Sequence, residues 1–586
     1  MSHLPSSFPP AARLRVAAVA TAAAVALPPL VAWSLPPVST FFNQTSALGL
    51  WGLAIAVAWP GLGGGRPVRA TWPLLVVVAA IAGFALAGWL AGPLPASLAT
   101  TPVVVLAAAA IVLLTGAAAG PRGPMLQGLL WGLVVAGLAS ACVALVQVFA
   151  PGWADGELVA RTTLPGRAVG NLRQPNHLAT LLLWAAIALV PLVGSAHLRA
   201  RCAFAALALL MAAIALSGSR TGALGVMLLA AWGLADRRLG HTGRALLIAA
   251  PLFYAGAWAG LWLAAQLGAA PLGALARGAG GDPSSSRFAV WANAWALVEQ
   301  HPWTGVGFGR FNFAWSLTPL PDRPVAFFDH VHNLSLQFAV ELGLPMALLL
   351  TALLLVALVR AARRAAAGDV ARHALLAMLL LVALHSLLEY PLWYVHVLLP
   401  ACWIFGASLA GASAAAPARR AFLVGGFAMA LAALVATADY LRVASIFTPP
   451  ARAAPLAQRI ADGQHSLAFA HHAHYAAATG AATPPALRLD AIDHAAYHLL
   501  DTRLMIAWAR SLDELGDADG ARHLAQRLRE FRNPASRDFF APCGAADVPD
   551  AAKPFQCLPP AVELGWRDFV HRRAGAGVQP ASGATQ

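Results

Sequence analysis

Apolar segments separated by short polar ones run from residue 16 to residue 438 of this chain. A helix needs about 20 mostly apolar residues to cross the hydrocarbon layer of a membrane, and about 12–13 segments come close to that length. The pattern predicts an all-α, polytopic helical membrane protein. The predicted transmembrane helices are 16–34, 46–60, 72–91, 101–118, 127–150, 176–194, 200–217, 221–235, 243–267, 334–359, 372–388, 391–411 and 421–438.

Two parts of the chain break this pattern. Residues 268–333 form a long polar loop, and residues 440–586 form a less apolar tail. Within the tail, residues 504–530 have the periodicity of two short amphipathic helices, and roughly the last dozen residues have a disordered composition. We therefore expect four parts: helices with short loops at 1–267, a large catalytic loop at 268–333, helices at 334–439 and a small helical domain at 440–586.

Composition and charge distinguish a membrane protein from a soluble or nucleic-acid-binding one. Only 11% of the residues are charged and the mean hydropathy is +0.67, whereas soluble domains are about 25% charged. The net charge of +14 does not indicate a nucleic-acid partner. The basic residues stand singly or in pairs at the ends of apolar segments, without the basic stripe of a nucleic-acid binder. The partner that this composition requires is a lipid bilayer.

The arginines alternate between connections, which predicts the orientation. Connections rich in Lys or Arg face the cytoplasm, so the loop 268–333, the connection 151–175, the turn 217–220 and the tail are expected on the opposite, periplasmic side. An odd number of helices then places the two ends of the chain on opposite sides. The arginines assigned to the cytoplasm are 13, 15, 66, 69, 122, 199, 201, 237, 238, 244, 360, 363, 364, 372, 419 and 420.

The end of the long loop carries the strongest candidate for chemistry. Asp329, His330, His332 and Asn333 lie where the chain re-enters the membrane. A neutral imidazole at such a boundary is suited to act as a general base. Capping of the next helix accounts for Asn333 alone. A His-x-His pair can bind zinc, but no Cys or carboxylate cluster supports it, so we expect no metal and no cofactor.

Three arginines on the predicted periplasmic side are candidates for phosphate binding. Arg220 ends a Ser-Gly-Ser-Arg turn and Arg287 opens an amphipathic segment that runs to Gln300. A guanidinium grips a phosphate through two hydrogen bonds, although Arg220 alone also fits an arginine that snorkels to the membrane surface. Arg310 follows a Gly-rich stretch, 305–309, that lacks the spacing of a dinucleotide fingerprint. It remains an open candidate.

Other polar residues interrupt the apolar pattern. Arg173, Gln174 and Asn176 precede a predicted span and suit sugar hydroxyls or phosphate, while Asn176 fits a helix cap equally well. Glu389 lies in a polar, aromatic break between two spans and is expected to pair with a loop arginine. We expect the tail histidines to be solvated surface residues, where His471-His472-x-His474 could bind metal only adventitiously. Cys543 and Cys557 could pair if the tail is exported. Those histidines are His465, His471, His472, His474, His494 and His498.

Several of these segments together resemble the O-antigen ligase/polymerase superfamily. The matching features are Ser-Gly-Ser-Arg at 217–220, Arg287 opening a helix before His-Pro-Trp-Thr-Gly-Val-Gly at 301–307, and His332-Asn333 ending the loop. Within it the chain is most similar to the PglL-type protein (pilin) O-oligosaccharyltransferases. That similarity depends on Gly-Asn-Leu-Arg-Gln-Pro-Asn-His at 170–177, on His-Ser-Leu-Leu-Glu-Tyr-Pro-Leu-Trp-Tyr at 385–394 and on the tail.

The resemblance implies a bacterial inner-membrane glycosyltransferase whose site faces the periplasm. A glycan would move en bloc from undecaprenyl diphosphate to a Ser or Thr hydroxyl of a periplasmic protein such as pilin. His332, favoured over His330 by its Asn neighbour, would act on the hydroxyl, with His330 and Asp329 setting its tautomer. Arg220 and Arg287 would stabilise the diphosphate. Candidates for substrate binding are Arg173, Gln174, Asn176, Asn333, Arg310 and Glu389. The alternatives are ligation to lipid A-core and glycan polymerisation. A transporter is disfavoured because the polar residues lie in loops and no repeat is visible.

Overall fold

The structure, a computed structural model, describes residues 10–62, 67–268, 287–411, 419–480, 483–544, 549 and 553–570. These residues form α-helices and short 3₁₀ helices, with no strand among them. The all-α fold predicted from the apolar pattern is therefore confirmed. The last dozen residues, predicted to be disordered, lie outside the described part.

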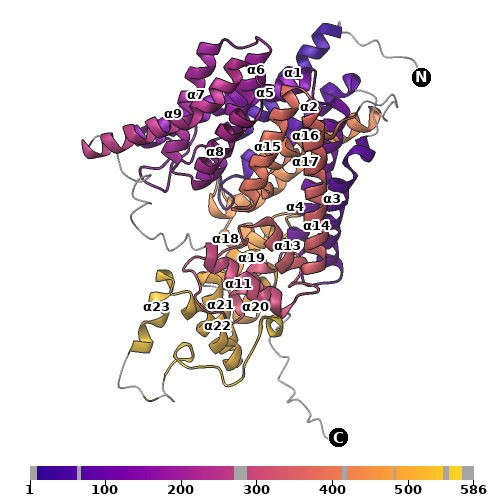
Figure 1. The fold of residues 1–586 in the computed structure, drawn as a ribbon. Helices are drawn as coiled ribbons and strands as arrows, with labels where there is room; N and C mark the ends of the chain where they lie inside the picture. Colours follow the sequence, from indigo (N-terminus) through magenta and orange to yellow (C-terminus); the bar gives the residue numbers. More distant parts are fainter. Residues whose placement is uncertain are drawn as a thin grey trace.

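Ten of the described helices are long and apolar enough to cross a membrane, and three shorter apolar helices accompany them. The chain is thus a multi-pass membrane protein. We call these helices the membrane body, the upper part of Figure 1. They are α1 (Pro10–Ala26), α2 (Phe41–Ala58), α3 (Pro67–Leu90), α4 (Ala96–Ala119), α5 (Pro124–Phe149), α6 (Pro175–Gly194), α7 (Ala200–Ser217), α8 (Arg220–Ala235), α9 (His241–Gln266), α14 (Leu344–Ala366), α15 (Val370–Ser386), α16 (Val395–Leu409) and α17 (Arg419–Phe447).

One predicted span is two helices in the structure. Residues 334–359 were expected to form one helix, but the structure divides them between α13 (Leu334–Leu342) and α14. Gly343 separates the two helices with φ +83°, and a Cβ there would lie 2.3 Å from the carbonyl oxygen of Trp303. Only glycine fits such a close backbone approach at positive φ. The apolar run conceals this break because leucines flank Gly343 on both sides.

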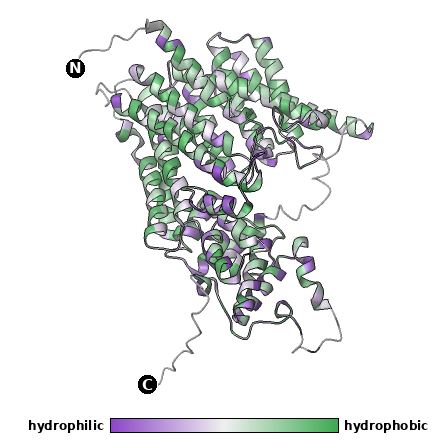
Figure 2. Ribbon diagram, turned by 180° about the vertical axis from the view of Figure 1, so that it is seen from behind, coloured by the Kyte–Doolittle hydropathy of each residue, from purple (hydrophilic) through white to green (hydrophobic). Residues whose placement is uncertain are grey.

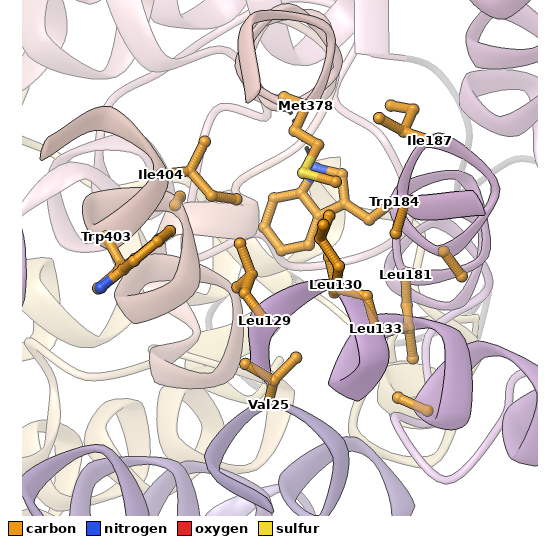
Figure 3. Close-up of a cluster of buried hydrophobic side chains, with 14 of the residues drawn as sticks. Val25, Leu129, Leu130, Leu133, Leu181, Trp184, Ile187, Met378, Trp403 and Ile404 are labelled. Carbon is orange, nitrogen blue, oxygen red and sulfur yellow. Dashed lines mark hydrogen bonds between the residues drawn. The ribbon is translucent and has the colours of Figure 1, made fainter. Parts of the chain in front are cut away.

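The core of the membrane body is a set of large aliphatic and aromatic side chains from distant helices. Trp184 of α6 donates its indole N–H to the carbonyl oxygen of Met378 in α15 at 3.1 Å, so its one polar atom is paired in an apolar environment. Figure 3 shows this bond together with side chains of α1, α5 and α16. Small residues bring other helices close: a Cβ on Gly52 of α2 would lie 2.5 Å from the carbonyl oxygen of Gly426 in α17.

The loop and the tail fold together into a second unit, which we call the polar body. Its members are α11 (Arg287–Gln300), α12 (Phe311–Leu317), α13, α18 (Leu456–Gln464), α19 (Ala470–Thr479), α20 (Pro485–Ala495), α21 (Thr502–Glu514), α22 (Ala518–Glu530) and α23 (Arg537–Phe540). It lies below the membrane body in Figure 1. Figure 2 shows hydrophilic residues more often there than along the spanning helices. The amphipathic helices expected in 504–530 are α21 and α22.

A single hydrophobic core joins loop and tail in the polar body. Phe313 of the loop stacks on Tyr497 of the tail with ring centroids 4.6 Å apart. The ring of Trp315 meets that of Phe531 edge to face at 5.2 Å. Arg323, whose side chain is fully buried, donates to Glu530 at 2.9 Å. Cys543 and Cys557 form a disulfide, as the sequence allowed. The two segments that the sequence presents as separate parts are thus interlocked.

The arginine-rich connections meet at one end of the membrane body. Arg122 pairs with Asp369 at 3.0 Å, and Arg372 donates to the carbonyl oxygen of Ser408 at 3.1 Å. Residues from three such connections are therefore neighbours. The polar body covers the opposite end of the same helices. The alternation of connections seen in the arginine pattern accordingly corresponds to two distinct ends of the fold.

Candidate active site

Glu389 is the centre of a polar cluster at the boundary between the two bodies. It lies in the connection between α15 and α16, and only 7% of its side chain is exposed. Its Oε1 pairs with the guanidinium of Arg287 and accepts the amide N–H of Asn176 at 2.9 Å. Its Oε2 lies 2.6 Å from Nδ1 of His332. One carboxylate therefore gathers an imidazole, a guanidinium and an amide from three distant segments.

The backbone around His332 holds it in an unusual conformation. His332 has φ +59°, a left-handed region that costs a non-glycine residue on the order of 1–3 kcal/mol. The neighbours fix it: the N–H of Val331 donates to Oε1 of Gln337 at 2.8 Å, and the Val331 carbonyl accepts from Trp291 at 2.9 Å. Asn333 then caps α13 by accepting the N–H of Leu336. In this conformation the imidazole faces Glu389.

A second chain of hydrogen bonds connects Glu389 to the turn before Arg220. Ser219 donates its hydroxyl to Oδ1 of Asn176 at 2.6 Å, and its Oγ accepts the N–H of Gly222, which caps α8. Asn176 is not the cap of its own helix, because Gln174 fills that role for α6. The Asn176 amide is thereby free to bridge Ser219 and Glu389. The capping alternative considered for Asn176 is wrong.

Charges in the cluster shift the protonation of its acids. Burial raises the pKa of Glu389, but the hydrogen bond and charge of His332 and the charge of Arg287 outweigh burial and lower the pKa to about 2. Glu389 is thus an anion at neutral pH. Burial also raises the pKa of Tyr390, further increased by the Asp329 carboxylate, so its phenol stays neutral.

His330 does not contact His332 in the way that the sequence suggested. Its Nδ1 pairs with Asp329 at 3.0 Å, and its ring stacks on Tyr390 with centroids 4.5 Å apart. Burial lowers the pKa of His330, but the Asp329 carboxylate outweighs it and raises the pKa above the ordinary value. The partner of His332 is Glu389, so the expectation that His330 and Asp329 set its tautomer is wrong. Both histidines nevertheless contact the Tyr390 ring.

Some of the remaining predicted site residues lie beside the Glu389 cluster and others lie apart from it. Arg220 is exposed at the first position of α8, next to Ser219, and Asn333 donates to the Leu387 carbonyl at 3.2 Å. Arg173 instead donates to the backbone carbonyls of Ala32 and Asn171. Arg310 lines a separate cavity of about 510 Å³ with Gly305, Gly307 and Trp566. The structure therefore gathers His332, Arg287, Asn176 and Glu389, with Arg220 and Asn333 adjacent.

Two contributors were not identified from the sequence. Ser219 was only part of the Ser-Gly-Ser-Arg turn, yet its hydroxyl donates to Asn176. Tyr390 was only one residue of the aromatic break around Glu389, yet its ring touches His330 and His332. The sequence signal for Tyr390 was its position beside Glu389, the acidic residue of a connection that also holds Trp393 and Tyr394. For Ser219 the signal was its position directly before a helix, where serine is favoured as a cap.

The geometry is suited to proton transfer beside an anion-binding surface. Accepting the Nδ1–H of His332, Glu389 leaves Nε2 as the basic nitrogen, the arrangement by which carboxylates orient catalytic histidines. Nε2 makes no hydrogen bond to another described residue. Arg287 keeps 25% of its side chain exposed, so part of its guanidinium can meet a ligand. A hydroxyl and an anionic group brought here would meet complementary partners.

Comparison with protein families gives three matches along the chain. Residues 205–351 match the family described as O-antigen ligase, and residues 168–192 match protein glycosylation ligase. Residues 373–538 match the C-terminal part of a virulence factor membrane-bound polymerase. No curated protein matches the chain. Each match supplies part of the cluster: Asn176 falls in the second, Arg287 and His332 in the first, and Glu389 in the third.

Proposed function

Because this chain belongs to the superfamily of O-antigen ligases and protein glycosylation ligases, we propose that it is a protein O-oligosaccharyltransferase. It moves a glycan en bloc from undecaprenyl diphosphate to a Ser or Thr hydroxyl of a periplasmic protein such as pilin. The observation that carries this proposal is the convergence of His332, Arg287 and Asn176 on Glu389. These families are glycan-transferring enzymes of the membrane, and the cluster supplies the chemistry that transfer needs.

The first task of the site is to activate the acceptor hydroxyl. Nε2 of His332 accepts the hydroxyl proton as the acceptor oxygen bonds to the anomeric carbon. Glu389 stabilises the imidazolium that forms, because it is already an anion against Nδ1. The proton then leaves to water. This role requires the ring orientation that the positive φ of His332 and its neighbours provide.

The second task is to stabilise the leaving group. As the bond between the anomeric carbon and the phosphate oxygen breaks, the electron pair stays on the diphosphate. Arg287 and Arg220 are the guanidinium groups placed to bind it, one beside Glu389 and one at the exposed start of α8. Fixed cations at a position where charge develops lower the barrier. The positive end of the α8 dipole favours an anion at the same place.

Two observations support a site that faces the periplasm. The polar body lies at the end of the membrane body opposite the arginine-rich connections, and such connections face the cytoplasm. The polar body also contains the disulfide Cys543–Cys557, a bond that persists in oxidising compartments. Both favour an inner-membrane enzyme that meets its lipid-linked donor at the outer leaflet.

A protein acceptor is preferred to lipid A-core or a growing polysaccharide. The glycosylation ligase match covers the segment that holds Asn176, and the tail adds a large folded surface beside the cluster. A lipid acceptor reaches the site from the bilayer and requires no such surface. Ligation to lipid A-core is the second candidate, favoured by the longer O-antigen ligase match.

The test uses the purified chain in liposomes with a polyprenyl-diphosphate oligosaccharide. Pilin is supplied in one arm and lipid A-core in the other, and glycan transfer is followed by the mass of the acceptor. We expect transfer to pilin, its loss in His332→Ala, and its retention in His197→Ala, an exposed histidine at the opposite end. Transfer to lipid A-core alone would replace the proposed acceptor. Undiminished transfer by His332→Ala would remove the catalytic assignment.

A further inference from the structure

Three histidines of the tail form a cluster apart from the Glu389 site. His471 and His472 lie on α19, and His498 follows α20. One ligand nitrogen from each lies within 4.8 Å of the others. Their ring centroids are 4.2, 4.5 and 4.8 Å apart. The expectation that the tail histidines are solvated is wrong for His471 and His472, which are buried at 6% and 8% exposure.

The cluster lies at a junction of three parts of the chain. Nδ1 of His471 is 3.2 Å from Oγ of Ser97 in α4 of the membrane body. On the other side, the Asp329 carboxylate of the loop interacts electrostatically with His498. Next to His498, Tyr497 stacks on Phe313 of the loop. The histidines therefore lie where the tail meets both the membrane body and the loop that carries His332.

We propose that His471, His472 and His498 bind a divalent transition metal of the zinc class. Imidazole is the preferred nitrogen ligand of such ions, and three histidines with one further oxygen ligand make a four-coordinate site. Ser97 engages Nδ1 of His471, which orients the ring and leaves Nε2 for the ion, as hydrogen-bond partners of metal-bound histidines do. The fourth ligand is the Asp329 carboxylate or a water. Bound there, the ion joins α19 to the segment that follows α20.

A neighbouring histidine pair provides the matched comparison. His474 of α19 stacks on His494 of α20 with centroids 4.4 Å apart. This pair joins α19 to α20 but offers two ligands, and among the described residues it is not part of any group of three potential metal ligands. If the tail histidines served only as packed aromatic rings, the two clusters would behave alike toward metal. A metal site predicts that they differ.

The experiment titrates the full-length chain, purified in detergent and stripped with a chelator, with Zn²⁺ against a chromophoric competitor. We expect one ion per chain for the wild type and for His494→Ala. His498→Ala, which changes an exposed side chain, should bind at least about a hundredfold more weakly, since loss of even a ligand's partner costs 10–100-fold. Zn²⁺ should raise the melting temperature of the first two chains only. Co²⁺ should give the visible absorption of a tetrahedral site in the same two.

Several outcomes overturn the proposal. One is a wild-type chain that takes up no Zn²⁺. Another is His498→Ala binding Zn²⁺ as tightly as wild type. A third is equal weakening by His498→Ala and His494→Ala, which means adventitious surface binding. His498→Gln, tested in parallel and checked for monodispersity, separates loss of the ligand from loss of the fold. Asp329→Asn then identifies the fourth ligand: a weaker site indicates the carboxylate, and an unchanged one indicates water.

Discussion

Glu389→Gln is the substitution that most directly tests the cluster. Glutamine keeps the size of the side chain and one oxygen, but it removes the charge that holds Arg287 and His332. The fall in the pKa of Glu389 from 4.5 to about 2 corresponds to about 3 kcal/mol of preference for the anion, since each pKa unit is about 1.4 kcal/mol. The side chain is 7% exposed, so solvent screens little of this. If the imidazolium of the transition state depends on the same charge, transfer slows on the order of a hundredfold.

The assay is glycan transfer in liposomes at saturating donor, with kcat and KM measured separately. Glu530→Gln is the matched control, because Glu530 pairs with the buried Arg323 at 2.9 Å in the polar body. We expect Glu389→Gln to lower kcat about a hundredfold, while Glu530→Gln lowers the melting temperature and leaves kcat within a few fold. A Glu389→Gln chain with wild-type kcat contradicts the reasoning. Equal loss in both variants means that stability, and not orientation of His332, is what the charge supplies.

Three further predictions concern two arginines and the melting temperature at low pH. Arg220→Lys should lower transfer on the order of tenfold or more, because lysine lacks the two-pronged donor; an unchanged rate supports the snorkelling interpretation. Arg310→Ala should leave kcat within a few fold, because Arg310 lies in a separate cavity; a loss comparable to that of His332→Ala places that cavity in the reaction. Because the pKa of Glu389 is lowered in the folded protein, its ionised carboxylate stabilises the fold. This stabilisation is fully present above the ordinary pKa of 4.5 and is lost as the pH falls from about 5 to about 2. Melting temperatures of wild type and Glu389→Gln should therefore converge at acid pH, and a constant difference between them contradicts this.

Most of the fold follows from the apolar pattern, because burial in lipid leaves a signal in every spanning helix. The break at Gly343 does not, since leucines surround it and its cause is a contact with the distant Trp303 backbone. The shared core of loop and tail was equally hidden. Neither Trp315 nor Phe531 indicates, from its own segment, that the other is its neighbour.

The sequence predicted most residues of the site, but it did not predict which of them contact one another. His332 and Arg287 stand out because polar groups are rare in this chain, and Glu389 was expected to pair with a loop arginine, which is confirmed. The sequence could not distinguish the partner of His332, since Asp329 is near in sequence while Glu389 is 57 positions away. Arg173 and Arg310, like Arg287, are arginines in polar segments between apolar ones. In the structure, however, they contact residues outside the Glu389 cluster. Only the tertiary contacts separate them.

The interlocked loop and tail have a consequence for biosynthesis. Arg323 and Glu530, which close the polar body, are 207 positions apart, and α14 to α17 are made between them. During translation the loop is therefore made long before its packing partners exist, with aromatic side chains such as Trp315 still uncovered. A nascent chain stopped after α17 would contain every predicted spanning helix, yet the polar body that packs around the His332 loop would be unfinished. Membrane insertion and acquisition of activity should therefore be separate events in time.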